Sequence, residues 1–237
     1  MLRAMDESTR AHPAVAAAAA AIVAAGRRLR ERGLLAGCDG NLSVRLGTHG
    51  IAVTPAGRRK DELAPDDVLV VALDADDDLA AAGGPRPSSD LAVHRAVYRA
   101  RPDARAIAHA HPPAVLACLL AGLRPDASVL PEARAVLGRV ALVPALPFGS
   151  AEVAVATAAA VLDAEVGAVL LDRHGALAVG RTLEEAVDRL EVLELLCTTW
   201  HAAWLAERDP RRRRRGDVPG PGPGPAALRH PGRGVRP

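Results

Sequence analysis

Apolar and polar positions along the chain predict a helix near each end of a folded region, with short strands between them. Ala11–Leu34 is an alanine-rich run that predicts the first helix, with Pro13 suited to its first turn and Gly33 to its end. Thr182–Arg208 has the apolar periodicity of a long amphipathic helix. These two segments should flank the strand-forming part of the chain.

The strand predictions come from short alternating or continuously apolar runs bounded by turn residues. They are Asn41–Leu46, Ile51–Thr54, Asp67–Leu73, Ala104–His111, Val140–Pro144, Gly167–Leu171 and Ala176–Val179. The first two are expected to form a hairpin. Ser88 or Ser89 can cap a helix that runs to about Ala100, and Pro112-Pro113 can end one strand and open another helix.

This mixture of helices and strands predicts one α/β domain over residues 12–207, preceded by a lead at 1–11. After Arg208 the periodic pattern stops, and residues 208–237 are rich in Arg, Pro and Gly. Such a composition cannot bury apolar surface, so we expect a disordered tail.

Composition indicates which residues pack the core and in which compartment the protein is expected. Hydrophobic residues make up 49% of the 237 positions and aromatic residues only 2%, so the core must be packed mainly by Ala, Val and Leu. No apolar run reaches the length of a membrane span. We see no secretory signal, and the three cysteines form no CxxC motif, so we expect free thiols in the cytoplasm.

The net charge of +2 hides an asymmetry between the predicted domain and the tail. Nine Arg and two Asp give residues 208–237 a charge of +7, so the preceding 207 residues carry −5. The basic balance of the whole chain is therefore no evidence for a nucleic-acid-binding domain. Arg211–Arg215 could bind nucleic acid or acidic surfaces, but we expect a solvated extension and neither nucleic acid nor a membrane as a partner.

Three histidines form the strongest candidate for a functional site. His109 and His111 are two apart at the end of a predicted strand, so both side chains can face one ion. The pair alone fits two unrelated histidines equally well. His174 adds to it, because it lies in a tight turn after a buried strand. Three histidines leave an open coordination position, which is typical of catalytic metals.

Other segments have the composition of anion-binding loops or of ordinary turns. Gly40–Ser43 and Thr54–Gly57 combine Gly with small polar side chains, and Ser88-Ser89 stands at a predicted helix start. Asp90 follows in the first turn. Its negative charge either stabilises the helix through the helix dipole, or faces the metal and carries a proton. His94 is one turn further along and is interpreted as a supporting residue rather than a ligand.

The order of these motifs resembles the class II aldolase/adducin-head family. The motifs are Gly-Asn-Leu-Ser-Val-Arg (40–45), Thr-Pro-Ala-Gly (54–57), Pro-Ser-Ser-Asp (87–90), Arg-Pro-Asp-Ala (101–104), His-Ala-His-Pro (109–112) and His-Gly (174–175). The resemblance covers residues from about 12 to 206. Within the family, the chain looks most like the L-fuculose-1-phosphate aldolases.

The resemblance implies a three-layer α/β/α domain with a central, mainly antiparallel sheet. It also implies a catalytic Zn²⁺ held by His109, His111 and His174, although three histidines also accept Mn²⁺, Co²⁺ or Fe²⁺. A phosphate pocket would use Asn41, Ser43, Thr54, Gly57, Ser88 and Ser89. Members of the family are commonly homotetramers with active sites between subunits, and we expect the same here.

The implied reaction is reversible cleavage of a small ketose phosphate to dihydroxyacetone phosphate and a short aldehyde, through a metal-stabilised enediolate. Asp90 would carry the proton of the enediolate carbon. A 4-epimerase acting on L-ribulose 5-phosphate and a sugar-acid-phosphate decarboxylase are alternatives in the same fold. A non-catalytic, adducin-like interaction module is an alternative of another class.

Two departures from the aldolase pattern, and the lysine content of the chain, bear on the mechanism. Asp90 stands where the aldolases usually have Glu, as in the epimerase branch. The only tyrosine, Tyr98, matches neither tyrosine that the aldolases use at the aldehyde side, so we propose Glu132 as a substitute there. The only lysine, Lys60, lies in a polar stretch, which argues against a Schiff-base aldolase.

Overall fold

A computed structural model describes residues 12–75 and 85–208, and within them one seven-stranded sheet forms the centre of the molecule. The strand order is β3-β2-β1-β4-β7-β6-β5. All neighbouring pairs are antiparallel except β5 and β6. The strands are β1 (Asn41–Leu46), β2 (Gly50–Val53), β3 (Leu69–Ala72), β4 (Ala106–Ala110), β5 (Arg139–Val143), β6 (Val166–Leu171) and β7 (Gly175–Gly180).

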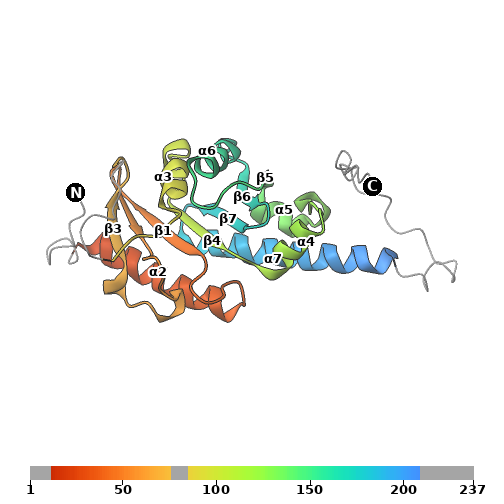
Figure 1. Cartoon of the computed structure of the whole chain (residues 1–237), viewed down its shortest axis with the longest axis horizontal. Coiled ribbons are helices and arrows are strands. Elements are labelled where there is room, and N and C mark those ends of the chain that lie inside the picture. Colours follow the sequence, from red (N-terminus) through yellow and green to blue (C-terminus); the bar gives the residue numbers. More distant parts are fainter. Residues whose placement is uncertain (1–11, 76–84, 209–237) are drawn as a thin grey trace, which may run out of the picture.

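Helices cover both faces of this sheet, which gives the predicted three-layer α/β/α architecture. They are α2 (Pro13–Glu31), α3 (Leu91–Ala100), α4 (Pro113–Leu120), α5 (Pro131–Leu137), α6 (Ala151–Ala160) and α7 (Leu183–Arg208). Short 3₁₀ turns span Lys60–Glu62, Pro65–Asp67 and Ala127–Val129. In Figure 1, α3 and α6 lie above the sheet and α2 and α7 below it.

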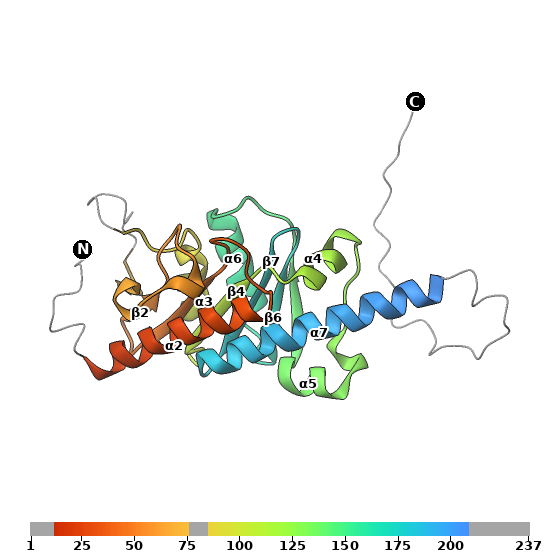
Figure 2. The ribbon, with the colours of Figure 1, turned by 90° about the horizontal axis from the view of Figure 1, so that it is seen from below.

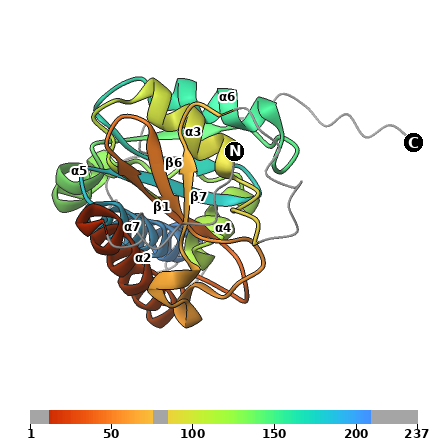
Figure 3. The ribbon, with the colours of Figure 1, turned by 90° about the vertical axis from the view of Figure 1, so that its left-hand side faces the viewer.

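The two layers of helices follow from alternation along the strands. Leu42 and Ala108 point to one face and pack into a core with α2 and α7. Ile107, one residue away, points to the other face and packs with α3 and α6. Figure 3 shows the sheet between the two helix layers.

The long helices α2 and α7 run side by side beneath the sheet (Figure 2), and an ion-pair cluster joins them. Arg28 donates from Nε to Glu191 at 2.7 Å and from Nη2 to Asp188 at 2.6 Å. Among the described residues, no helix is both long enough and apolar enough to cross a membrane.

The structure confirms the seven predicted strands and corrects several details. The continuously apolar run Val140–Pro144 is typical of a buried strand, but β5 is an edge strand in which only Val143 is buried. Helices α5 and α6 were not predicted. Helix α6 is almost all Ala and Val, so its sequence shows no alternation of apolar and polar faces. The predicted lead and tail lie outside the described residues, except for Arg208 at the end of α7.

The predicted serine cap of α3 is also corrected. Asp90 is the N-cap residue, and its side chain makes no capping hydrogen bond. Ser88 instead accepts a hydrogen bond from the backbone N–H of Asp90, at 3.3 Å. The carboxylate of Asp90 is therefore not used to cap the helix and can contact other side chains.

Candidate metal centre

His109 lies in β4 and is 2% exposed. Its Nδ1 is 2.9 Å from the carbonyl oxygen of Ala176 in the neighbouring strand β7. A carbonyl only accepts hydrogen bonds, so Nδ1 carries the proton and Nε2 keeps a lone pair. The sheet itself thus fixes the ring nitrogen that His109 offers to a ligand.

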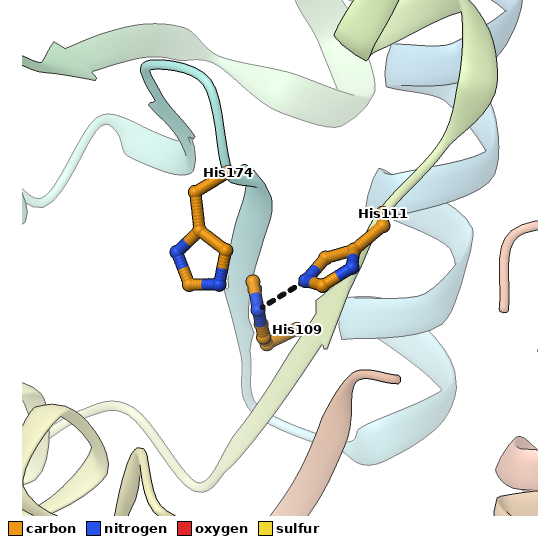
Figure 4. A group of neighbouring side chains, drawn as sticks. All are labelled: His109, His111 and His174. Carbon is orange, nitrogen blue, oxygen red and sulfur yellow. Dashed lines mark hydrogen bonds between the residues drawn. The ribbon is translucent and has the colours of Figure 1, made fainter. Parts of the chain in front are cut away.

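His111 follows the last residue of β4 and turns its ring toward His109 (Figure 4). Its Nδ1 is 3.3 Å from the carboxylate of Asp39, and its Nε2 is 3.1 Å from Nε2 of His109. A carboxylate behind one ring nitrogen orients the other nitrogen toward a metal. Asp39 is a supporting residue that the sequence did not single out.

His174 comes from the turn between β6 and β7. Arg173 adopts a positive φ of 59° there, and Gly175 has a φ of 152°. A Cβ at Gly175 would meet the carbonyl oxygen of Ala110 at 2.4 Å, so only glycine lets the turn approach β4. The ring centroid of His174 consequently lies 4.7 Å from that of His109 and 5.0 Å from that of His111.

The three rings form a set that fits a divalent cation. One potential ligand atom from each histidine lies within 4.8 Å of the others. Nε2 of His174 is buried with no hydrogen-bond partner among the described residues. Burial, followed by the neighbouring histidines, holds the pKa of His109 well below its usual value, so the ring is neutral as metal binding requires.

A buried carboxylate stands beside this centre. Asp90 is 5% exposed, and its Oδ2 is 3.7 Å from Nε2 of His109. Nδ2 of Asn41 donates a hydrogen bond to the same oxygen at 2.8 Å. The site therefore combines three potential metal ligands with a carboxylate positioned to take or give a proton.

A pocket opens onto these groups. The predicted site residues that line it are Asn41, Gly57, Ser88, Ser89, Asp90, His109, His111 and His174. Its other lining residues are Cys38, Asp39, Gly40, Ala56, Lys60 and Phe148. Three segments far apart in sequence, around residues 40, 57 and 89, therefore meet beside the histidines.

Ser43, Thr54 and Glu132 are predicted site residues that do not line this pocket. Ser43 and Thr54 are 0% exposed and are used internally. The Oγ of Ser43 contacts the ring of His94, and Oγ1 of Thr54 accepts from the backbone N–H of Leu42. Glu132 is exposed near the start of α5.

Lys60 belongs to the pocket wall rather than to an open polar stretch. It is 3% exposed, and burial lowers the pKa of its amine. Nζ donates to the carbonyl oxygens of Cys38, at 2.5 Å, and Arg58, at 2.9 Å. The lysine thus ties together the two loops that form one side of the pocket.

Phe148 forms the apolar edge of the pocket. Its ring is perpendicular to that of His174, with centroids 5.3 Å apart and an interplanar angle of 88°. The residue is 64% exposed and follows β5 in a loop without a recognisable motif. Its rarity was the only available signal, since it is the single Phe of the chain.

Known proteins share sequence and fold with this chain. Residues 20–201 match the family described as Class II Aldolase and Adducin N-terminal domain. The chain is 35% identical, over 190 residues, to a 5-methylthioribulose-1-phosphate/5-deoxyribulose-1-phosphate aldolase from Rhodospirillum rubrum, covering 78% of this chain and 81% of that protein.

Two further similarities extend this result. The chain is 34% identical to a 3-oxo-tetronate 4-phosphate decarboxylase from Haemophilus influenzae, covering 73% of this chain and 81% of that protein. The crystal structure of L-fuculose-1-phosphate aldolase from Thermus thermophilus superposes with a TM-score of 0.68 at 32% identity, covering 84% of this chain and 99% of that one.

Proposed function

Because the chain belongs to the class II aldolase and adducin N-terminal domain family, we propose that it is a metal-dependent aldolase. The substrate is a small ketose phosphate, and the products are dihydroxyacetone phosphate and a short aldehyde. The observation that carries the proposal is the convergence of three histidines next to a buried carboxylate, with Oδ2 of Asp90 3.7 Å from Nε2 of His109.

The metal ligands are His109, His111 and His174, and the ion is Zn²⁺, with Mn²⁺, Co²⁺ and Fe²⁺ also compatible with three imidazoles. Bound there, a divalent cation would supply positive charge next to the oxygen atoms at the reacting carbon. The intact ligand set argues against a non-catalytic, adducin-like module. A stoichiometric metal content after gentle purification supports the enzyme, and its absence would remove this proposal.

The chain's own groups perform the proton transfer and hold the substrate. The carboxylate of Asp90 takes or returns the proton of the enediolate carbon, and Asn41 keeps that carboxylate oriented. Ser88, Ser89 and Gly57 line the same pocket and offer hydroxyl and backbone N–H donors to the phosphate. The phosphate-binding roles predicted for Ser43 and Thr54 become indirect, because both side chains are buried and used within the fold.

A direct assay tests the reaction. Dihydroxyacetone phosphate is incubated with glycolaldehyde or lactaldehyde, with and without a chelator, and ketose phosphate is measured. Metal-dependent product supports the proposal. Borohydride treatment during turnover distinguishes the Schiff-base route, since a covalent adduct on Lys60 would overturn the metal mechanism.

A decarboxylase is the second candidate, favoured by the 34% identity to a 3-oxo-tetronate 4-phosphate decarboxylase. Loss of CO₂ from a sugar-acid phosphate leaves the same kind of enediolate, so the same residues would serve. Release of CO₂ from such a substrate, without condensation of any short aldehyde, would favour this second reaction. The 4-epimerase is separated by conversion of L-ribulose 5-phosphate to its 4-epimer.

We also propose a homotetramer with active sites between subunits. Apolar side chains stand exposed on α4 and α7, with Leu120 73%, Leu195 60% and Leu205 52% exposed. Figure 2 shows α7 extending beyond the other elements. In such an assembly, the exposed Glu132 reaches the aldehyde side from a neighbouring copy. Light scattering measures the assembly, and Glu132→Gln tests the role of that residue.

A further inference from the structure

A chain of five buried polar side chains runs through the interior and ends at Asp90. It consists of Tyr98, Ser43, His94, Asn41 and Asp90. The successive contacts are Tyr98 Oη to Ser43 Oγ at 2.8 Å, Ser43 Oγ to His94 Nδ1 at 2.6 Å, and His94 Nε2 to Asn41 Oδ1 at 2.6 Å. The final one, from Asn41 Nδ2 to Asp90 Oδ2, is 2.8 Å.

The direction of these hydrogen bonds follows from their end at a carboxylate. An ionised Asp90 only accepts, so the amide of Asn41 must present its N–H₂ group to it. The amide oxygen of Asn41 then faces His94, which must place its own proton on Nε2. Nδ1 of His94 is left as an acceptor for the hydroxyl of Ser43.

Burial of the side chains keeps His94 in one protonation state. The pKa of His94 is lowered to about 4 by burial, so the ring is neutral and has one N–H donor. Because the hydroxyl of Ser43 donates to His94, the hydroxyl of Tyr98 donates to Oγ of Ser43 at 2.8 Å, and the backbone oxygen of Ser43 lies 3.1 Å away as a second acceptor. Each hydrogen bond of the chain therefore has one donor and one acceptor, and every donor points toward Asp90.

The ring of His94 decides which way the amide of Asn41 faces. In the flipped amide, the oxygen of Asn41 would face the carboxylate of Asp90, and its N–H₂ group would face the N–H of His94. Both contacts would be repulsive and buried. Without the N–H of His94, the amide of Asn41 could adopt either orientation. His94 would thus act on the site from a distance, since neither His94 nor Tyr98 lines the pocket.

We propose that His94 is a positioning residue, which holds the amide of Asn41 in the orientation that presents an N–H to the catalytic carboxylate of Asp90. This inference rests on the proton-transfer role proposed for Asp90. The second N–H of Asn41 remains for the substrate, because Asn41 lines the pocket. Tyr98 and Ser43 fix the tautomer of His94.

Three variants test the role of His94. His94→Phe removes the N–H and should lower kcat by roughly tenfold to a hundredfold, with a smaller change in KM and unchanged metal content. His94→Gln keeps an N–H donor near the position of Nε2 and should recover most of the lost kcat. His49→Gln is the matched control, since the side chain of His49 is 87% exposed, and it should leave kcat unchanged.

Each outcome bears on the proposal. Wild-type kcat in His94→Phe, or a His94→Gln variant as slow as His94→Phe, would overturn it. If His94→Phe does not fold, the comparison of His94→Gln with wild type is joined by a spectroscopic test. Nitrogen NMR of the metal-loaded protein should show the proton of His94 on Nε2, and a proton on Nδ1 would overturn the proposal.

Different experimental results contradict the proposed reaction and the positioning role of His94. A wild-type protein without aldolase, decarboxylase or epimerase activity contradicts the proposed function. An active wild type with an Nδ1–H tautomer at His94, or with an unaffected His94→Phe variant, contradicts only the positioning role.

Discussion

Asn41 of β1 and His109 of β4 are direct partners across antiparallel strands. Side chains opposite each other in such a pair point to the same face of the sheet. The pairing therefore places the amide that orients Asp90 beside a predicted metal ligand. The first residue of β1 and the fourth residue of β4 thus both line the pocket.

Replacing Asp90 by Asn should lower kcat by about a hundredfold to ten-thousandfold, because an amide cannot accept the proton. Metal content should stay unchanged, since Asp90 is not one of the three clustered histidines. Steady-state kinetics and elemental analysis measure both quantities. Asp74→Asn is the control, because the side chain of Asp74 is 65% exposed. Unchanged turnover in Asp90→Asn would disprove the proton-transfer role.

Replacing Asp39 by Ala should weaken metal binding by about tenfold, because His111 loses the carboxylate 3.3 Å from its Nδ1. The expected value is at the low end for such supporting residues, since the side chain of Asp39 is 51% exposed. Competition with a chromogenic chelator gives the affinity. Asp66→Ala, in an exposed turn, is the control. Equal affinity in wild type and Asp39→Ala would contradict the supporting role.

The folded protein should lose stability as the pH falls from about 6.5 to about 4, the two pKa values of His94 in the unfolded and folded states. In this range the unfolded chain binds a proton that the folded chain rejects, so protonation favours unfolding. This pKa shift of His94 corresponds to a loss of unfolding free energy on the order of 3 kcal/mol at the acid end of the range.

Urea unfolding at several pH values measures this effect, with His94→Gln as the comparison. All other ionisable groups are the same in both proteins, so the difference between the two pH profiles belongs to His94. The variant should lose less stability than wild type between pH 6.5 and 4. Parallel profiles would show that burial of His94 is not linked to stability.

Replacing Phe148 by Ala should raise KM for aldehydes with an apolar tail by about fivefold, as expected for losing roughly half of a buried Phe contact. The ring lines the pocket next to His174 and is largely exposed. KM is compared between glycolaldehyde and a longer aliphatic aldehyde. Leu146→Ala, from the same loop but outside the pocket lining, is the control. An equal change for both aldehydes would argue against a specificity role.

The residue pattern was sufficient for one α/β domain, its seven strands and the histidine set, and the family resemblance implied the three layers. Strand alternation and turn residues act locally, so they are visible in the order of residues. His-Ala-His at a strand end and His-Gly after a buried strand are equally local signals. The helix Ala151–Ala160 escaped prediction because its burial depends on α3 and on the sheet, rather than on its own pattern.

The roles of individual polar residues were decided only by the tertiary structure. Ser43 and Asn41 are two apart in one motif, yet Asn41 lines the pocket while Ser43 faces His94 and Tyr98 of α3. Lys60 looks like a surface residue in sequence, and the fold buries it between two carbonyl oxygens. Local sequence predicts where strands and turns form, whereas the packing of α3 and the loops against the sheet determines which side chains meet the substrate.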